Sequence, residues 1–326
     1  MTIGISIGDP NGIGPEVVLK TFADSELLTV CTPIVYAHFD FANQQAAHFD
    51  WQLPIERMHD QPKQGVLNVV DCWTESFQPQ YGEVDAKAGQ LSVTSLVAAT
   101  ANLKKGNINA LVTAPIHKAA IQSEDFRFPG HTDYLAQAFD GDALMFLVHP
   151  DLRVALVTDH VAVKDITRHI TTDRVAQKLN AVAHSLQQDF GISNPRIAVL
   201  GLNPHAGDEG VIGEEEVNLL EPMLQTHQID KTEISGPFSA DAFFGSQSYK
   251  NYDAILAMYH DQGLIPFKTL SFGQGVNFTA GLSAVRTSPD HGTAFGIAGT
   301  GQANPQSFRQ AVQTAIEVVK RRNIST

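Results

Sequence analysis

Short apolar segments alternate along this chain with longer amphipathic segments, and this alternation constrains the possible folds more than any other feature. The apolar segments have strand length, and they lie at residues 3–7, 33–36, 110–113, 143–148, 153–158, 196–200 and 254–258. Stretches with helical spacing lie between several of them, at 89–105, 172–190, 213–226 and 307–322. Strands that alternate with helices predict an α/β protein with a largely parallel sheet.

The expected domain organisation follows from the length and from the lack of a linker. The chain has 326 residues, of which 43% are hydrophobic and 17% charged. It is therefore long enough for about two domains of roughly 150 residues, with the composition of an ordered globular protein. No internal repeat and no Gly/Ser-rich or Pro-rich linker is visible. We therefore expect two domains that interleave through crossing strands.

Charge and cysteine content exclude several classes of partner. With 35 acidic and 22 basic side chains the net charge is −13, which repels nucleic acid and anionic membranes, so neither is an expected partner. The N-terminus lacks a basic segment before Asp9, and no apolar run approaches the roughly 20 residues of a membrane span. Only Cys31 and Cys72 occur, too few for a disulfide framework. We expect a cytoplasmic protein.

The segment Gly8-Asp9-Pro10-Asn11-Gly12-Ile13-Gly14-Pro15-Glu16 follows the first predicted strand and precedes a helical stretch. It lacks the third glycine of a dinucleotide-binding fingerprint, and the Gly-Lys-Ser/Thr of a phosphate-binding loop is missing as well. We therefore reject both motifs. The local pattern predicts a tight strand-to-helix turn that needs the backbone freedom of glycine.

Histidine occurs at the ends of three predicted strands, in Thr158-Asp159-His160, Asn203-Pro204-His205 and Tyr259-His260-Asp261. Strand ends in α/β sheets carry ligand sites, and three imidazoles with an open position are typical of a catalytic metal centre. The separations of 45 and 55 residues match no known motif. A hydrogen-bonded packing role for each histidine is therefore the alternative.

A second group is positive or polar and lies in regions otherwise poor in charge: His131, Thr132, Lys268, Asn277 and Arg286. Such residues can form an anion-binding pocket in a negatively charged protein, because arginine can donate two parallel hydrogen bonds to an anion and lysine supplies a point charge. The alternative is that each is an ordinary surface or capping residue. The glycine-rich stretch 286–305 could approach a flat ligand closely, or could be a long surface loop.

Two of these motifs together resemble the isocitrate and isopropylmalate dehydrogenases. They are Gly12-Ile13-Gly14-Pro15-Glu16 and the region that contains His291-Gly292-Thr293-Ala294, Ile297-Ala298-Gly299 and Ala303-Asn304-Pro305. That superfamily has no Rossmann fold and holds the adenosine of NAD in the loop that corresponds to the second motif. The resemblance implies an NAD site, with NADP as the alternative cofactor, formed by His291, Gly292, Thr293, Gly299 and Asn304.

Within that superfamily the whole chain resembles the 4-hydroxythreonine-4-phosphate dehydrogenase family. The resemblance is carried by Ile7 to Glu16, Thr113 to Lys118, Gly130 to Ala136, Gly201 to Asp208, Gly236 to Asp241 and Tyr259 to Lys268. It implies His160, His205 and His260 as ligands of a divalent zinc, cobalt or magnesium ion. It implies His131, Thr132, Lys268, Asn277 and Arg286 as substrate contacts. Asp133 stands where glutamate is expected in many members, a conservative departure.

The implied fold consists of two α/β domains of the isocitrate/isopropylmalate dehydrogenase-like type, with an active-site cleft between them. We expect residues 1–124 with 280–326 to form the first domain, which carries the NAD loop. Residues 125–279 are expected to form the second domain, which carries the metal ligands and mediates a homodimer. The active site is expected near the subunit interface.

The implied activity is NAD-dependent oxidation of 4-phosphooxy-L-threonine at its C3 hydroxyl, followed by decarboxylation to 3-amino-2-oxopropyl phosphate, in pyridoxine 5'-phosphate (vitamin B6) biosynthesis. Asp241 and Asp261 are the candidates for the base that removes the hydroxyl proton. A related dehydrogenase that acts on a threonate or erythronate phosphate, or on a dihydrodiol carboxylate, is an alternative. Two alternatives from other classes are a phosphometabolite-binding protein without activity and a metal-dependent hydrolase that needs no nicotinamide.

Overall fold

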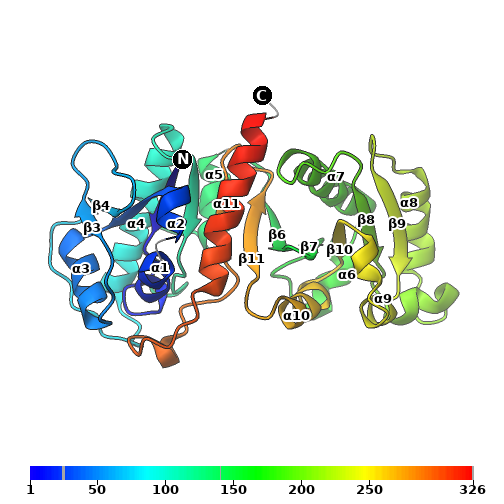
Figure 1. Ribbon diagram of the computed structural model, residues 1–326. Coiled ribbons are helices and arrows are strands. Elements are labelled where there is room, and N and C mark those ends of the chain that lie inside the picture. Colours follow the sequence, from blue (N-terminus) through cyan, green and yellow to red (C-terminus); the bar gives the residue numbers. More distant parts are fainter. Residues whose placement is uncertain (24–25, 140, 325–326) are drawn as a thin grey trace. The chain divides into compact units, whose positions relative to one another are not determined.

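The structure is a computed structural model that describes residues 1–23, 26–139 and 141–324 (Figure 1). The chain forms two compact units. Unit 1 consists of Met1–Ala143 and Leu282–Val319, and unit 2 consists of Leu144–Gly281 and Lys320–Thr326. Each unit thus contains segments that are far apart in the sequence.

Unit 1 is an α/β unit with a parallel sheet. Its strands are β1 (Thr2–Ser6), β2 (Thr32–Ala37), β3 (Ile55–Arg57), β4 (Leu67–Asp71), β5 (Ala110–Thr113) and β12 (Arg286–Pro289). They pair in parallel in the order β3-β4-β2-β1-β5-β12. Its helices are α1 (Gly14–Ala23), α2 (Glu26–Val30), α3 (Phe39–His48), α4 (Ala86–Lys104), α5 (His131–Ala138), η5 (Phe295–Ile297) and α11 (Gln306–Ile324), of which the last turn, from Lys320 on, clusters with unit 2.

Helices cover both faces of this sheet, with α4 and α11 on opposite sides (Figure 1). Strands β2, β5 and β12 are buried along their whole length, as expected for parallel strands between two helical layers. Helix α4 begins where the side chain of Asp85 accepts a hydrogen bond from the backbone N–H of Ala88 over 2.7 Å, which is a standard N-cap.

The division between the units lies later in the sequence than the expected boundary at residue 125. Phe126 and Leu135 pack in the same hydrophobic core as Leu96 of α4 and Leu111 of β5. Residues 125–143, including α5, therefore cluster with unit 1.

Unit 2 has a mixed sheet. Its strands are β6 (Leu144–His149), β7 (Leu152–Leu156), β8 (Arg196–Leu200), β9 (Glu233–Phe238), β10 (Ala254–Ala257) and β11 (Val276–Ala280). They follow the order β11-β6-β7-β10-β8-β9; β6 runs antiparallel to both of its neighbours, whereas β7, β10, β8 and β9 are parallel.

The helices of unit 2 are η1 (Val163–Asp165), α6 (Ile166–His169), α7 (Thr172–Gln188), η2 (Pro204–Gly210), η3 (Glu216–Leu220), α8 (Glu221–Thr226), α9 (Ala240–Gly245), η4 (Ser248–Asn251) and α10 (His260–Ser271). Helices α7 and α10 lie on opposite faces of the sheet (Figure 1). Leu264 and Phe267 of α10 form a core with Leu156 of β7 and Leu200 of β8. The expectation of an α/β protein is confirmed, and the sheet is parallel where the predicted metal ligands lie.

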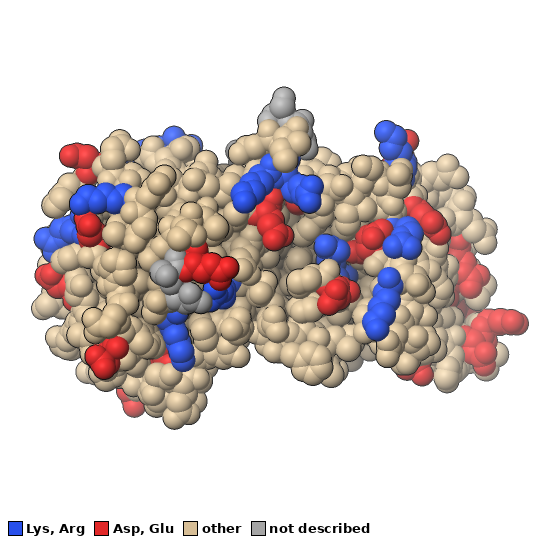
Figure 2. Space-filling model, in the orientation of Figure 1, with Lys and Arg blue, Asp and Glu red and all other residues tan. Residues whose placement is uncertain are grey.

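The distribution of charge and the character of the helices can be described for the residues that the structure covers. On the face shown in Figure 2, described Lys and Arg side chains are interspersed with Asp and Glu and form no continuous basic patch. None of the helices in the described part of the chain combines the length and the apolar character that crossing a membrane requires. The cysteines, Cys31 and Cys72, are unpaired.

Candidate active site

The predicted metal ligands follow neighbouring strands of unit 2. Strand β10 pairs in parallel with β7 on one side and with β8 on the other. His160, His205 and His260 follow β7, β8 and β10 in the chain. Because these strands are parallel, their carboxyl ends share one edge of the sheet. The fold therefore brings the three histidine-bearing segments to the same edge.

His160 and His260 lie close together, with 6.0 Å between their ring centroids. Oδ1 of Asp261 lies 2.7 Å from Nδ1 of His260, an arrangement that orients the ring and leaves Nε2 available to a metal. Two imidazoles at this spacing suit a late divalent ion. Within residues 1–23, 26–139 and 141–324, however, no three His, Cys, Asp or Glu side chains converge closely enough to hold an ion. His205 does not complete the group within the described part of this chain.

His205 lies in an exposed turn with an uncommon backbone. Residues His205 to Glu209 all have left-handed φ values between 47° and 81°, and only Gly207 among them is a glycine. This conformation costs an L-residue roughly 1–2 kcal/mol, so neighbouring groups must hold the turn in place.

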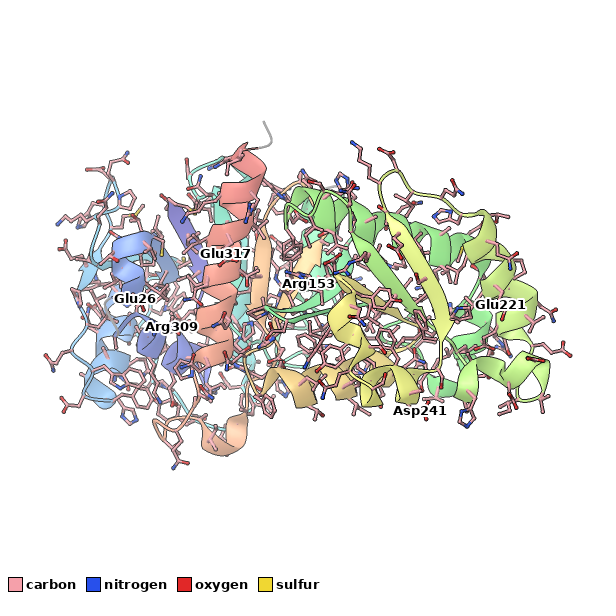
Figure 3. The ribbon with its side chains drawn as sticks, turned by 45° about the vertical axis from the view of Figure 1, so that its right-hand side comes forward. Glu26, Arg153, Glu221, Asp241, Arg309 and Glu317 are labelled. Atoms are coloured by element: carbon pink, nitrogen blue, oxygen red, sulfur yellow. The ribbon has the colours of Figure 1, made fainter. Side chains whose placement is uncertain are left out.

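Asp241, labelled in Figure 3, lies at the start of α9. It is close enough to His205 for their charges to interact. The Ser239 hydroxyl donates a hydrogen bond of 2.5 Å to Oδ1 of Asp241. This bond lowers the pKa of Asp241 below its usual value, with His205 contributing less. The side chain is exposed and is therefore ionised at neutral pH. Of the two candidate bases, Asp241 is near His205 and Asp261 pairs with His260.

Gln262 connects two of the histidine-bearing segments, a role that sequence reasoning missed. Its Nε2 donates to the carbonyl of Gly201 over 2.7 Å, at the end of β8, and its Oε1 accepts from the N–H of Met258 over 2.7 Å, at the end of β10. The Thr158 hydroxyl donates to the carbonyl of Met258 over 2.8 Å. Gln262 is visible in the sequence as the amide side chain directly after His260-Asp261, but its partner Gly201 is 61 residues away, so the connection could not be predicted.

Arg286, predicted to contact the substrate, lies in unit 1 and is only 2% exposed. Its Nη2 and Nε donate to the Thr113 hydroxyl over 2.7 and 3.2 Å. Burial lowers the pKa of Arg286 to about 9. The guanidinium therefore stays protonated at neutral pH, and a positive charge with little water around it attracts an anion.

His131 and Thr132 are the first residues of α5, also in unit 1. Nε2 of His131 is buried and has no hydrogen-bond partner. Burial lowers the pKa of His131 well below its usual value, and the charges of Arg286 and Lys118 lower it further. His131 is therefore neutral at neutral pH. A buried nitrogen without a partner, beside two cations, suits an anionic ligand that accepts hydrogen bonds. Sequence reasoning gave Lys118 no role, although it belongs to a quoted motif.

The other two predicted substrate contacts, Lys268 and Asn277, belong to unit 2. Lys268 lies on α10 with an exposed side chain, and Asn277 lies on β11. Oδ1 of Asn277 is buried and has no hydrogen-bond partner. The structure thus brings His131 and Arg286 together within unit 1. Lys268 and Asn277 belong to unit 2.

The predicted cofactor loop is held against the N-terminal turn within unit 1. The N–H of Ile13 donates to the carbonyl of Thr293 over 3.0 Å. Oε1 of the buried Glu16 accepts from the N–H of Ala303 over 2.7 Å. Lys20 donates to the carbonyls of Gly301 and Ala303, each over 3.0 Å. The motif Gly12 to Glu16 thus fixes the loop that the resemblance assigns to NAD.

The residues of this loop fit a flat ligand with hydrogen-bonding groups. A Cβ added at Gly292 or Gly296 would meet no atom within 4 Å, so the backbone is open to close approach there. Nε2 of His291 is buried and has no hydrogen-bond partner. Gly299 has a φ of +75°, and a Cβ there would collide with the Tyr81 ring at 2.4 Å. Asn304 accepts a hydrogen bond from the N–H of Gln306 and so begins α11.

The turn before α1 also contains a buried carboxylate that sequence reasoning did not single out. Asp9 is fully buried, and its Oδ1 accepts from the N–H of Asn11 over 2.9 Å while Oδ2 has no partner. Burial raises the pKa of Asp9. Gly8 has a φ of +76°, and a Cβ there would lie 2.5 Å from the carbonyl oxygen of Pro115. The prediction of a tight turn that requires glycine is thereby confirmed at Gly8.

Comparison with solved structures defines the class of fold. An isocitrate dehydrogenase from Methylococcus capsulatus aligns with a TM-score of 0.51 over 99% of this chain and 86% of its own, at 12% identity. This likeness concerns the fold alone and confirms the expected isocitrate dehydrogenase-like class.

Sequence comparison then defines the family. The model of the family described as pyridoxal phosphate biosynthetic protein PdxA matches residues 29–315, and the chain belongs to this family. A 4-hydroxythreonine-4-phosphate dehydrogenase from Bacteroides thetaiotaomicron is 45% identical over 98% of this chain and 89% of its own. A crystal structure of the enzyme of that name from Klebsiella pneumoniae has a TM-score of 0.84 at 32% identity, over 98% of both chains. The expected dehydrogenase class is confirmed.

Relatives with other names are also similar to this chain. A D-threonate 4-phosphate dehydrogenase from Pectobacterium atrosepticum is 36% identical over 97% of this chain and 98% of its own. The structure of a terephthalate 1,2-cis-dihydrodiol dehydrogenase from Burkholderia xenovorans has a TM-score of 0.65 at 27% identity, over 97% of this chain and 98% of its own. Both are dehydrogenases, so the class is shared while the substrates differ.

Proposed function

We propose that this chain oxidises 4-phosphooxy-L-threonine at its C3 hydroxyl with NAD and that the product loses carbon dioxide to give 3-amino-2-oxopropyl phosphate, a step of pyridoxine 5'-phosphate biosynthesis. The observation that carries the proposal is the 45% identity, over 98% of this chain, to a relative named for this activity. A reducing cytoplasm, which suits the two unpaired cysteines, is the proposed location.

The residues of unit 1 support a phosphorylated substrate. Arg286 supplies a buried positive charge, the exposed Lys118 supplies a positive charge that also acts on His131, and His131 supplies a neutral nitrogen without a partner. Phosphate accepts several hydrogen bonds and carries negative charge, so it complements this group. Thr132, Lys268 and Asn277 are proposed as further contacts to the same substrate.

The metal would be held by His160, His205 and His260. A divalent ion bound there would act as a Lewis acid on the substrate hydroxyl and on the ketone that replaces it. Asp261 orients His260 through the contact at Nδ1, and Asp241 is proposed as the group that takes the hydroxyl proton, because it is ionised and exposed near His205. The loop 291–304 would bind NAD and align the nicotinamide with C3.

A dehydrogenase for D-threonate 4-phosphate is the second candidate. The relative of that name covers nearly the whole chain at 36% identity. Both substrates carry a hydroxyl on C3 and a phosphate on the neighbouring C4, so the anion-binding group around Arg286 suits either one.

The test compares substrates and cofactors in one assay. NADH formation is followed with 4-phosphooxy-L-threonine, D-threonate 4-phosphate and unphosphorylated 4-hydroxy-L-threonine, each with NAD or NADP, and with and without a chelator. We expect the highest kcat/KM for 4-phosphooxy-L-threonine with NAD and loss of the signal with chelator. A higher kcat/KM for D-threonate 4-phosphate would favour the second candidate, and substrate breakdown without nicotinamide would indicate a hydrolase.

We further propose that a second copy of the chain covers the histidine edge of unit 2. Large apolar side chains follow each metal histidine and are exposed: Val163 (82%), Val211 (82%) and Ile265 (63%). Exposed apolar side chains around a site are typical of an interface. Val211→Asp should shift the protein toward monomer in light scattering and lower activity in parallel. A wild-type chain that is monomeric and fully active across the assay range would contradict a shared site.

A further inference from the structure

The left-handed turn that carries His205 packs against a carboxylate that belongs to no predicted site. Glu216 begins η3, a single turn of π-helix, and is 0% exposed. Short π-helical turns are frequent at functional sites. A carboxylate with no access to water must be satisfied by donors of the protein.

The donors to Glu216 come from the residues that lead directly into His205. Oε1 accepts hydrogen bonds from the backbone N–H groups of Leu202 and Asn203, over 2.7 and 2.8 Å. Oε2 accepts from Nδ2 of Asn203 over 2.9 Å. One side chain thus fixes both backbone and side-chain groups two and three residues before His205.

Three glycines of this segment lie close to Glu216 or to the Asn203 amide that donates to it. A Cβ added at Gly207 would lie 2.7 Å from Oε2 of Glu216, and one at Gly201 would lie 3.1 Å from Oε1. A Cβ at Gly213 would overlap the side-chain amide of Asn203. The turn therefore closes around Glu216, and a side chain at Gly207 would displace the carboxylate.

We propose that Glu216 is a positioning residue that fixes the His205 turn at the histidine edge of unit 2, so that the imidazole is held ready to bind a metal once an ion and a second copy complete the site. The proposal rests on the metal site of the proposed function. The turn contains four non-glycine residues with left-handed φ, which its own hydrogen bonds from Ala206 to Asn203 and from Ile212 to Gly207 hold only in part. The three hydrogen bonds to Glu216 supply the remaining constraint, from outside the turn.

Glu216→Gln tests this role with almost no change of size. A glutamine keeps one acceptor oxygen but places an NH2 group against the donors of Leu202 or Asn203, whichever way the amide points. Groups that orient a metal ligand typically contribute about 10- to 100-fold to metal affinity. We therefore expect the Kd for Co²⁺, measured by titration of the metal-free full chain, to rise by about that factor. The visible spectrum of the cobalt-loaded protein should change as well.

Two further variants keep the test specific. Glu214→Gln removes the same charge from an exposed side chain that contacts Asn218, and its Co²⁺ affinity and spectrum should match the wild type. Asn203→Ala removes the donor to Oε2 of Glu216, together with the bond of the same amide to Oε2 of Glu215, but keeps both backbone bonds to Oε1 of Glu216. It should therefore weaken Co²⁺ binding less than Glu216→Gln. If Glu216→Gln does not fold, Asn203→Ala decides: unchanged Co²⁺ binding by this variant would overturn the proposal.

The outcomes separate this proposal from the proposed function. Unaltered Co²⁺ affinity and spectrum in folded Glu216→Gln would overturn the positioning role while leaving the metal site intact. A wild-type chain that binds no Co²⁺ would overturn the metal site, and the positioning role with it. A core variant such as Leu179→Ala, which removes a fully buried side chain of α7, should lower the thermal midpoint but leave the Kd for Co²⁺ unchanged. A parallel loss of Co²⁺ affinity in that variant would overturn the specific role of Glu216.

Discussion

The buried charged groups of unit 1 and the predicted metal ligands of unit 2 are held in opposite ways. In unit 1, Arg286, Asp9 and Glu16 are buried and are fixed by neighbours once the chain has folded. In unit 2, His160 and His205 are exposed at strand ends, and no three ligands converge in the described part of the chain. The comparison teaches that the charged groups of unit 1 are preorganised, whereas the histidines of unit 2 need an ion, and in our proposal a second copy, to become a site.

Removing a histidine of unit 2 should have the largest effect. His205→Ala should reduce turnover below detection and lower the bound divalent metal, because a three-ligand site loses one of its imidazoles. Metal analysis and NADH formation check both. The matched control is His184→Ala, which changes an exposed histidine of α7 in the same unit and should keep activity and metal. Near-normal metal and turnover in His205→Ala would show that unit 2 holds no such site.

Removing the buried charge of unit 1 should have the next largest effect. Loss of one hydrogen bond to a charged group costs about 1.5 to 3 kcal/mol, so Arg286→Ala should lower kcat/KM by roughly 10- to 150-fold. The control is Arg309→Ala, whose guanidinium pairs with Glu26 over 2.7 Å elsewhere in unit 1 (Figure 3). Arg286→Ala should cost much less with unphosphorylated 4-hydroxy-L-threonine. An equal loss with both substrates would refute a phosphate contact.

Changing Glu16, which accepts a hydrogen bond from the cofactor loop, should have a smaller effect that is confined to NAD binding. Glu16→Gln weakens the hydrogen bond from Ala303, and a net hydrogen bond is worth about 0.5 to 1.5 kcal/mol. The KM for NAD should therefore rise about 2- to 12-fold, while the KM for the phosphorylated substrate stays close to the wild-type value. Steady-state kinetics with each substrate varied in turn measures the difference. If only the KM for the phosphorylated substrate rises, the loop is not the NAD site.

The smallest predicted effect concerns the pH dependence of stability in unit 1. Because the pKa of His131 is lowered in the folded state, the folded chain keeps this ring neutral while the unfolded chain binds a proton below about pH 6.5. His131 should therefore destabilise the fold as the pH falls below 6.5, by at most about 1.4 kcal/mol per pH unit. Urea unfolding at pH 6.5 and 5.5 should show a smaller loss in His131→Gln. An equal loss in both proteins would mean that the ring is not held neutral.

The sequence was most informative where local pattern decides the structure. The apolar segments 3–7, 110–113 and 196–200 correspond to β1, β5 and β8, because their apolar residues are buried by the helices around them. Strand β12 could not be predicted in this way, because Arg286-Thr287-Ser288-Pro289 has no apolar pattern. These polar residues are buried because β12 pairs with β5, where Arg286 donates to the Thr113 hydroxyl. The helix predicted at 213–226 begins in the structure as the π-helical η3.

For the candidate site, the sequence predicted which side chains follow the strands but not what holds them. Histidines after apolar segments were visible, and parallel pairing brings their strands together. The contacts of Gln262 with Gly201 and of Glu216 with Leu202 join segments that are 61 and 14 residues apart. Such contacts depend on the tertiary fold and leave no periodic signal in the chain.

In our proposal, this chain carries out one metal-dependent oxidation followed by decarboxylation. The most direct measurement follows NADH by absorbance and labelled carbon dioxide together, with carboxyl-labelled 4-phosphooxy-L-threonine and NAD, in the presence of Co²⁺ or of a chelator. The account predicts equal amounts of NADH and carbon dioxide with Co²⁺, and neither with chelator. Formation of either product at an undiminished rate in a chelator-treated, metal-free protein would contradict it.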